Sequence, residues 1–340
     1  MSSFKSASPI LAKAYDTVLL DLDGVVYIGD DAVPGVIGAL NQAHDEFGLT
    51  LTCVTNNASR SAQRVAQHLR ELGLEVTAED VVTSAQAGAA ELAKLIPQGS
   101  KVFVLGSKDL AREVELVGLN PSVDEALSYD ALIQGYWPDM PWRMMEFAAS
   151  ILQTGVPWIA TNMDMTIPTP TGVGPGNGTM VTALGTTVNR TPTLVAGKPQ
   201  IPLMQQSIDR TSAKRPLVIG DRLDTDIHGA NNVGIDSLLV LSGVTTIKDI
   251  LAAPIEQRPT YLAWDASAVL SAQSGTETNE QVTTCGGWKV ANGDLLGQGD
   301  GLDAVAAIAV AHWNGDISLD SALHALSGIG LEVRNPHISG

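Results

Sequence analysis

Short apolar runs alternate with longer amphipathic segments through most of the chain. The strand candidates are residues 17–21, 49–55, 101–106, 131–135, 157–161, 192–197, 216–221 and 237–241. Helix-like stretches lie between them, for example residues 34–47, 59–72 and 141–153. Runs that are apolar on both faces and separated by helices are typical of a parallel sheet covered by helices. The pattern therefore predicts an α/β fold.

Four of these runs end in a polar signature. DLDG follows the first run, TNN the second, GK the run at 192–197 and GD the run at 216–221. In an open parallel sheet the carboxyl ends of the strands lie along one edge, and ligands bind beyond that edge. We therefore expect the four signatures to converge on one crevice.

Three of the other strand candidates, residues 101–106, 131–135 and 157–161, lie between Pro97 and Pro192, which predicts a smaller α/β unit inserted into the first. The chain has 340 residues, more than one compact core usually contains. The sequence thus predicts four segments. They are a first part of the core (1–96), an inserted α/β cap domain (97–192), a second part of the core (193–270) and a linker with a small C-terminal extension (271–340).

The pattern changes after Trp264. Residues 271–281 are polar and contain Gly and Ser, as a linker does. A predicted hairpin around residues 290–294 and two apolar-periodic helices, residues 301–313 and 319–326, follow. Because no chemical motif occurs here, we expect a small addition that packs on the core or on a partner subunit. A homodimer is one interpretation of this segment.

Composition and charge narrow the function classes. Apolar residues make up 44% of the chain and charged residues 17%, as in ordinary soluble globular proteins. The formal net charge is −17, and lysines and arginines do not cluster. Such a chain is not expected to bind nucleic acid or an anionic membrane. An anionic ligand would need a local positive charge of its own.

Cysteine usage and the N-terminus point to a reducing compartment. Cys53 and Cys285 are the two cysteines and form no CxxC pair, so neither a disulfide framework nor a thiolate metal site is expected. Residues 1–16 lack the apolar core of a signal peptide, and no run of about 18 apolar residues occurs. We therefore expect a cytoplasmic protein.

The acidic residues at the strand ends suggest a metal site. Asp21 and Asp23 have the spacing that places two side chains on the same face of a strand. Their repulsion is costly unless a cation lies between them or one is protonated. Asp221 could join them around one hard cation, and an all-oxygen ligand set favours Mg²⁺ over Zn²⁺. The alternative is structural: a turn at the first pair, and Asp224 or Thr225 as the cap of an acidic helix N-terminus.

The other two signatures suggest an anion site. Thr55 and Asn56 precede a predicted helix, where a hydroxyl and free backbone N–H groups can hold a phosphate oxygen. Lys198 lies between Gly197 and Pro199 and would supply the local positive charge that an anionic ligand needs. Taken singly, the TNN stretch is more often a capping loop, and a lone lysine is more often solvated.

Four motifs in this order resemble those of a known family. DLDGVVY, VTNNAS, AGKP and GDRLDTDIHGANNVG are similar to the signature motifs of the haloacid dehalogenase (HAD) superfamily, and specifically of its subfamily IIA. That group includes NagD-like, p-nitrophenylphosphatase and phosphoglycolate phosphatase members. The resemblance covers roughly residues 16–265. Asp21 and Thr55 are too close in sequence for a domain between them, whereas the segment from Thr55 to Lys198 can contain one, as in subfamily IIA.

The resemblance implies a Rossmann-like doubly wound parallel sheet core with an inserted α/β cap domain. It also implies a Mg²⁺-dependent phosphatase that hydrolyses small-molecule phosphate monoesters through an aspartyl-phosphate. Asp21 would be the nucleophile, and Asp23 the general acid and then the general base. The ion would be held by the Asp21 side chain, the Asp23 backbone carbonyl and Asp221.

By the same resemblance, Thr55, the N–H of Asn56 and Lys198 would hold the phosphate oxygens. Asp226 would orient Lys198 or a metal-bound water. Within the predicted insertion, Asn162 and Asp164 are candidates for contacting the substrate, and a structural turn after a strand is the equally weighted alternative.

Other functions are weighed against the phosphatase. A dehalogenase of this superfamily would lack the carboxylate at Asp23, and a phosphomutase would carry its cap after the first motif. A catalytically inert binding or regulatory protein could keep the fold, although no motif favours it. The motifs indicate phosphate transfer but not the alcohol. Sugar phosphates, phosphoglycolate and nucleotides therefore stay open as substrate classes.

Overall fold

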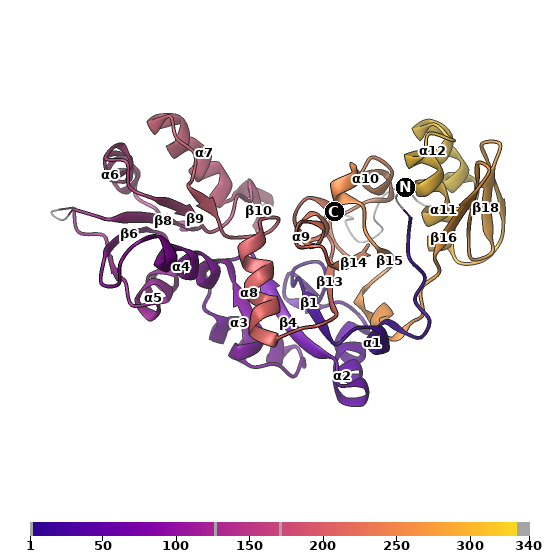
Figure 1. The fold of residues 1–340 in the computed structure, drawn as a ribbon, viewed down its shortest axis with the longest axis horizontal. Helices are drawn as coiled ribbons and strands as arrows, with labels where there is room; N and C mark the ends of the chain where they lie inside the picture. The colour runs from indigo at the N-terminus through magenta and orange to yellow at the C-terminus, as the bar shows by residue number, and fades with distance from the viewer. Residues whose placement is uncertain (1–2, 126–127, 170–171, 332–340) are drawn as a thin grey trace. The chain divides into compact units, whose positions relative to one another are not determined.

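Two compact units make up the chain, which is shown as a computed structural model in Figure 1. The structure describes residues 3–125, 128–169 and 172–331. The first unit consists of Met1–Cys53, Leu69–Glu75 and Arg210–Gly340, and the second of Val54–His68 and Val76–Asp209. None of the helices in the described parts has both the length and the apolar composition of a membrane span.

A parallel sheet organises the first unit. Five of its six strands belong wholly or mostly to this unit: β1 (Thr17–Leu20), β4 (Thr50–Thr55), β13 (Pro216–Gly220), β14 (Asp236–Val240) and β15 (Tyr261–Ala263). They lie in the order β15-β14-β13-β1-β4, with β1 paired in parallel to both β13 and β4. The predicted parallel sheet is therefore confirmed, and β15 is a strand that the apolar pattern did not indicate.

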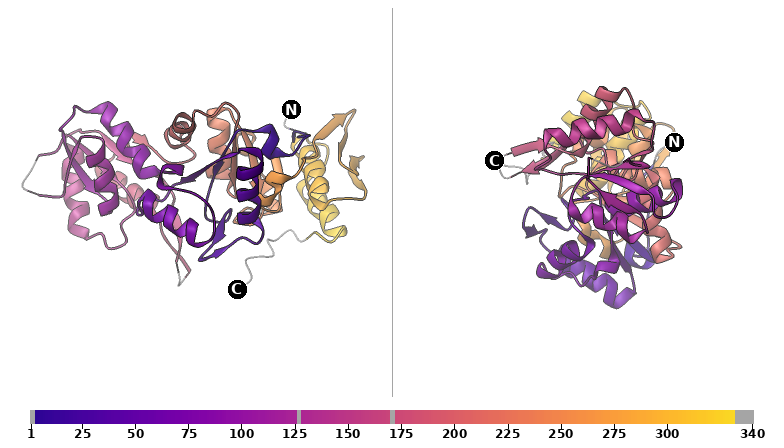
Figure 2. Two further views of the ribbon diagram at one scale, coloured as in Figure 1. Left: turned by 90° about the horizontal axis from the view of Figure 1, so that it is seen from below. Right: turned by 90° about the vertical axis from the view of Figure 1, so that its left-hand side faces the viewer.

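Helices flank this sheet, as Figures 1 and 2 show. In one group, three helices pack against one another: α1 (Leu11–Ala14), α2 (Val36–Phe47) and η4 (Ala266–Leu270). Another group consists of η2 (Leu223–Ile227), α9 (His228–Val233) and η3 (Ile255–Gln257), and α10 (Ile247–Leu251) follows β14. A short antiparallel pair, β2 (Tyr27–Ile28) and β3 (Asp31–Ala32), lies shortly after β1. The α/β fold is thus the one expected.

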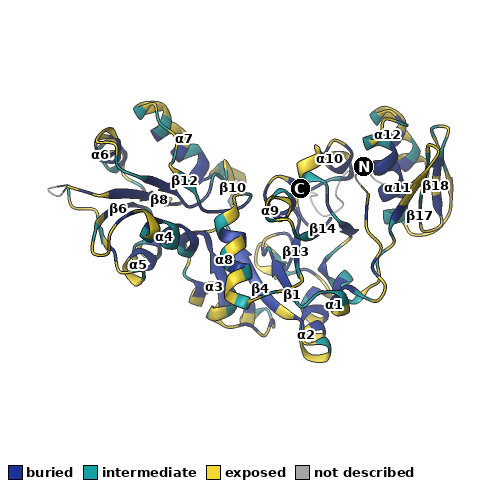
Figure 3. Ribbon diagram, viewed as in Figure 1, coloured by how far each residue is buried: buried dark blue, intermediate teal, exposed yellow. Residues whose placement is uncertain are grey.

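The C-terminal extension adds an antiparallel sheet and two helices to the first unit. The elements are β16 (Thr276–Asn279), β17 (Val282–Cys285), β18 (Trp288–Ala291), β19 (Asp294–Gly297), α11 (Gly301–Trp313) and α12 (Leu319–Gly328). Both predicted helices and the predicted hairpin are present. Every residue from Ala304 to Ala311 is at most 4% exposed, so α11 is buried all round (Figure 3). The extension packs on the core, one of the two placements expected for it.

A second parallel sheet organises the second unit. Its strands lie in the order β12-β9-β8-β6-β7 and all pair in parallel: β6 (Lys101–Leu105), β7 (Asn120–Ser122), β8 (Ala131–Gln134), β9 (Trp158–Ala160) and β12 (Leu194–Val195). Successive residues of β6 face opposite sides. Val102 and Val104 lie in one buried cluster, and Phe103 and Leu105 in another.

Each of these clusters is covered by helices. The first includes residues of α4 (Ser84–Leu95) and α5 (Lys108–Leu116), and the second includes residues of α6 (Trp142–Gln153) and α7 (Asn177–Val188). The remaining elements of this unit are α3 (Ala62–Glu71), most of which belongs here, η1 (Ala78–Asp80), β5 (Val81–Thr83), the hairpin of β10 (Thr166–Thr169) and β11 (Gly172–Pro175), and α8 (Ile201–Thr211).

The two units divide the chain at other positions than the predicted segments. Helix α4 precedes the predicted insertion, yet its residues Ala85, Ala89 and Leu92 are buried in the cluster formed with β6 and β8. Its small residues allow the helix to lie close to that sheet. The division into four segments stays a prediction.

Candidate functional site

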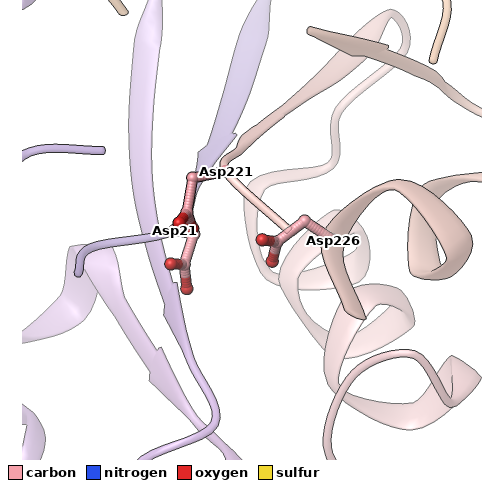
Figure 4. Close-up of side chains that lie close together, drawn as sticks. All are labelled: Asp21, Asp221 and Asp226. Atoms are coloured by element: carbon pink, nitrogen blue, oxygen red, sulfur yellow. The ribbon is translucent and has the colours of Figure 1, made fainter. Parts of the chain in front are cut away.

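Three carboxylates gather in the first unit, where β1 and β13 end side by side. One carboxylate oxygen from each of Asp21, Asp221 and Asp226 lies within 4.8 Å of the others (Figure 4). Asp21 directly follows β1, and its N–H donates to the carbonyl of Ile219 in β13 at 2.9 Å. Asp221 directly follows β13, and Asp226 lies on η2. The parallel register of the two strands therefore brings the first two carboxylates together, as the sequence predicted.

A close-fitting loop holds Asp221, which is 1% exposed. Its Oδ2 accepts a hydrogen bond from the N–H of Val244 at 2.7 Å, and its backbone carbonyl accepts one from Thr245 at 3.3 Å. A side chain at Gly243 would collide with this carboxylate, and one at Gly24 would lie 2.6 Å from Oδ2. Gly24 also has φ +83°, a left-handed conformation that favours glycine. Two glycines thus permit the backbone to enclose the carboxylate.

The same loop is tied to the turn that follows Asp23. The hydroxyl of Ser242 donates to the carbonyl of Gly24 at 2.6 Å, and this bond is buried. Because β1 ends at Leu20, Asp23 lies beyond the strand. The next residue, Gly24, donates its N–H to the carbonyl of Tyr27 at 2.8 Å. Asp23 is exposed. Strand alternation therefore does not determine where its carboxylate points.

Asp226 is also almost fully buried, at 1% exposed. Its Oδ2 accepts a hydrogen bond from the N–H of Arg222 at 3.1 Å. The structural alternative for this segment was a helix capped by Asp224 or Thr225. Arg222 precedes the helical turn instead and no side chain caps it, while Asp224 pairs with the Arg222 guanidinium at 2.8 Å. Asp226 therefore binds the backbone at the start of η2 and also belongs to the acidic cluster.

The three carboxylates fit a hard divalent cation. Two of them are 1% exposed, and like charges at this spacing repel strongly when water is excluded. All the donor atoms are oxygens, which suits Mg²⁺ rather than a thiolate-binding metal.

A second group of predicted residues comes together in the second unit, around Asn56. Its Oδ1 accepts the N–H of Lys198 at 2.7 Å, and its Nδ2 donates to the Lys198 carbonyl at 3.0 Å and to Asp164 Oδ1 at 3.1 Å. Its backbone carbonyl accepts hydrogen bonds from Asn162 Nδ2 at 2.7 Å and from the Ser84 hydroxyl at 2.5 Å. Asn56 therefore joins the second motif, the third motif and the predicted insertion.

Lys198 is buried rather than solvated, with 3% of its surface exposed. Its Nζ donates to the carbonyl of Val54, the residue before Thr55, at 3.1 Å. A side chain on Gly197 would lie 2.6 Å from Asn56 Oδ1, so glycine permits this close approach. Thr55 accepts a hydrogen bond from the N–H of Asn57 on its hydroxyl at 3.1 Å. The ammonium group is thus held at the end of β4.

Asn162 and Asp164, predicted to contact a substrate, form an ordered turn after β9. Asn162 Oδ1 accepts the N–H of Asp164 at 3.2 Å, and the Asn162 carbonyl accepts Asn177 Nδ2 at 2.8 Å. Both side chains also bind Asn56. These contacts fit a role in holding Asn56, and a role in substrate binding stays a prediction.

Two parts of the site carry no motif that the sequence analysis used. The loop at residues 242–245 follows the predicted strand at 237–241, so its Ser-Gly pair was a fifth polar signature at the same sheet edge. Ser84 gave no signal, because its bond to Asn56 depends on the packing of α4.

Comparison with known proteins relates these residues to a family. A model described as haloacid dehalogenase-like hydrolase matches residues 18–120, and one described as HAD-hydrolase-like matches residues 195–268. A D-glycerol 3-phosphate phosphatase from Mycobacterium tuberculosis is 41% identical over 317 residues, which are 89% of this chain and 87% of that protein.

Solved structures are similar as well. The crystal structure of glycerol phosphate phosphatase from Mycobacterium tuberculosis in complex with magnesium matches with a TM-score of 0.82 and 37% identity, covering 94% of this chain and 99% of its own. NagD from Escherichia coli K-12 matches with a TM-score of 0.67 and 29% identity, covering 74% of this chain and 97% of its own. The mycobacterial match therefore reaches into the C-terminal extension.

Proposed function

Because this chain belongs to the haloacid dehalogenase-like hydrolases, in subfamily IIA with NagD, we propose that it is a phosphatase of small-molecule phosphate monoesters that uses Mg²⁺. The cluster of Asp21, Asp221 and Asp226 carries this proposal, since it places three buried or half-buried carboxylates, two at neighbouring strand ends and one on η2, close enough for one cation to offset their repulsion. Relatives named as phosphatases, one of them solved with magnesium, support it.

The metal ligands would be the side chains of Asp21 and Asp221 and the backbone carbonyl of Asp23. When bound, the ion would let the nucleophile and the phosphate approach each other and would offset charge on the transferring group. Asp226, fixed by the Arg222 N–H, would orient a water at the site.

Asp21 would attack the phosphorus, form the aspartyl-phosphate and release the alcohol. Asp23, exposed at the turn, would protonate the leaving oxygen and then remove a proton from the water that hydrolyses the intermediate. The second carboxylate would make the site a phosphatase rather than a dehalogenase, because a halide leaves without a proton.

Thr55, the N–H of Asn56 and Lys198 would hold the non-bridging oxygens of the phosphate. The Asn56 side chain would fix the lysine backbone, with Asn162 and Asp164 holding Asn56 in turn. The predicted cap would exclude water and select the alcohol. A homodimer and a cytoplasmic location stay predictions.

Glycerol phosphate is the first substrate to test, since the relative that is 41% identical bears that activity in its name. Sugar phosphates, phosphoglycolate and nucleoside monophosphates form the comparison set. A kcat/KM for glycerol phosphate at least about tenfold above the others would identify the class.

The direct test compares the wild type with Asp21→Asn on p-nitrophenyl phosphate. The substitution keeps the shape of the side chain but removes the nucleophile, so kcat should fall at least about a thousandfold. Circular dichroism and the melting temperature should show a folded variant. Chelation should abolish wild-type activity, and added Mg²⁺ should restore it. Full activity of Asp21→Asn, or indifference to a strong chelator, would disprove the proposal.

A further inference from the structure

The loop that holds Asp221 leads directly into α10. Val244 and Thr245 donate their N–H groups to Asp221, and the next residue, Thr246, caps the helix. The Thr246 hydroxyl accepts the N–H of Asp249, and Asp249 Oδ2 accepts the N–H of Thr246. The position of α10 therefore sets the position of the loop.

Helix α10 depends on the C-terminal extension for its place. It spans five residues, too few for a stable isolated helix. Ile247, Ile250 and Leu251 are 4%, 0% and 1% exposed, and they lie in one buried cluster with residues 304–311 of α11. In Figure 1, α10 lies above β14 and β15, and the extension of the same unit lies to its right.

One side chain of the extension binds the end of α10 by hydrogen bonds. Trp313, the last residue of α11, donates its Nε1–H to the carbonyls of Ile250 and Leu251, each at 3.2 Å. Both are carbonyls of the last turn of α10, and the Ile250 carbonyl also accepts the N–H of Ala253 at 3.2 Å. The indole thus adds a side-chain donor from the extension at the helix end.

The indole is itself held from two sides. The ring of Phe4 stacks on it with centroids 5.6 Å apart, and the guanidinium of Arg258 lies 4.6 Å from its centroid. Arg258 also donates from Nε to the carbonyl of Ala253, just after α10. Trp313 therefore has a fixed position from which to locate α10.

We propose that Trp313 is a positioning residue for the metal site, acting through α10 and the loop at residues 242–245 on the Asp221 carboxylate. This inference rests on the proposed function. It assigns the C-terminal extension a part in catalysis: the extension keeps two backbone N–H groups in place around a metal ligand. A misplaced loop would let Asp221 rotate away and would weaken Mg²⁺ binding.

The test compares Trp313→Phe with Trp288→Phe. Trp288 lies in the same buried cluster at 9% exposed, and its Nε1 has no hydrogen-bond partner among the described residues. Both variants lose similar volume, but Trp313→Phe alone loses hydrogen bonds to α10. Calorimetric titration with Mg²⁺ in the absence of substrate, on the full chain, measures the affinity. Thermal melts with and without Mg²⁺ give an independent measure.

Trp313→Phe should bind Mg²⁺ about fivefold more weakly than Trp288→Phe, the size expected for the loss of one neutral hydrogen bond. Its kcat on p-nitrophenyl phosphate should recover at saturating Mg²⁺. Equal Mg²⁺ affinities in the two variants would overturn this inference but not the proposed function. If Trp313→Phe does not fold, Phe4→Leu, which removes the stacked ring, should weaken Mg²⁺ binding in the same direction, and an unchanged affinity would overturn the inference. A wild type that binds no Mg²⁺ would overturn the proposed function and this inference with it.

Discussion

The side-chain amide of Asn56 pairs with both backbone groups of Lys198, accepting from the N–H at 2.7 Å and donating to the carbonyl at 3.0 Å. The two bonds imitate one rung of a β-ladder between residues far apart in sequence. Lys198 is 3% exposed, so its backbone has little access to water. The Asn56 amide therefore supplies the hydrogen bonds that water would otherwise make to the Lys198 backbone, and it fixes the position of Lys198 within the second unit.

Asn56→Ala should lower kcat/KM on p-nitrophenyl phosphate by about 10- to 100-fold, because buried backbone groups of Lys198 would lose their partners and the ammonium would shift. The matched control is Asn57→Ala. Asn57 is exposed. Among the described residues, its side chain accepts hydrogen bonds from the N–H and the hydroxyl of Ser59 and from no other residue. Similar kinetics for the two variants would show that Asn56 does not position the lysine.

Gly243→Ala should weaken Mg²⁺ binding by about tenfold or more and destabilise the protein by about 1–3 kcal/mol, because the new methyl group would collide with the Asp221 carboxylate. The control is Gly38→Ala, on the exposed face of α2, where no described atom lies within 4 Å of the added carbon apart from its chain neighbours and the nearby backbone of its own helix. Removing a helical glycine should stabilise by up to about 1 kcal/mol. Urea unfolding in chelator and Mg²⁺ titration measure the two effects, and normal Mg²⁺ binding by Gly243→Ala would contradict the close fit.

Asp236 should make stability depend on pH in the acid range. Burial alone would raise its pKa, but hydrogen bonds from Lys5 at 2.6 Å and Tyr15 at 2.7 Å, together with the Lys5 charge, outweigh burial and lower it. A folded pKa below the unfolded value, about 4, adds stability above pH 4, and this stability is lost as the pH falls through the folded pKa.

Asp236→Asn should therefore lower the melting temperature at pH 7, and the difference from wild type should shrink below about pH 4. Asp45→Asn, at an exposed position of α2, is the control and should give a small difference. Melting curves between pH 3 and 7 measure this. A difference that stays constant across the range would show that the Asp236 charge does not contribute.

The strands were predictable because their signal is local. Residues 17–20 and 216–220 are apolar on both faces, and a parallel sheet is the usual fold that buries such runs. Asp21 and Asp221 could then be placed together, because parallel strands share their carboxyl edge. The prediction needed only the order of strand ends, not their side-chain contacts.

The contacts that hold these residues in place were not predictable, because they are not local in sequence. The N–H of Val244 reaches Asp221 because Gly243 lets the backbone pass the carboxylate, and a glycine after a strand does not specify that approach. The five bonds of Asn56 depend on three other chain segments meeting at one point. Helix α4 joins the second sheet through small residues that would suit either unit.

The burial of residues 304–311 of α11 determines how long a stable fragment of this protein must be. The second family match ends at residue 268, where a sequence-based design would place a boundary. A fragment cut there would expose the apolar residues of α10 to water and would leave Phe4 without its aromatic neighbour, so it should aggregate during purification. A helix that carries no motif thus determines where a fragment of this protein can be cut and stay folded.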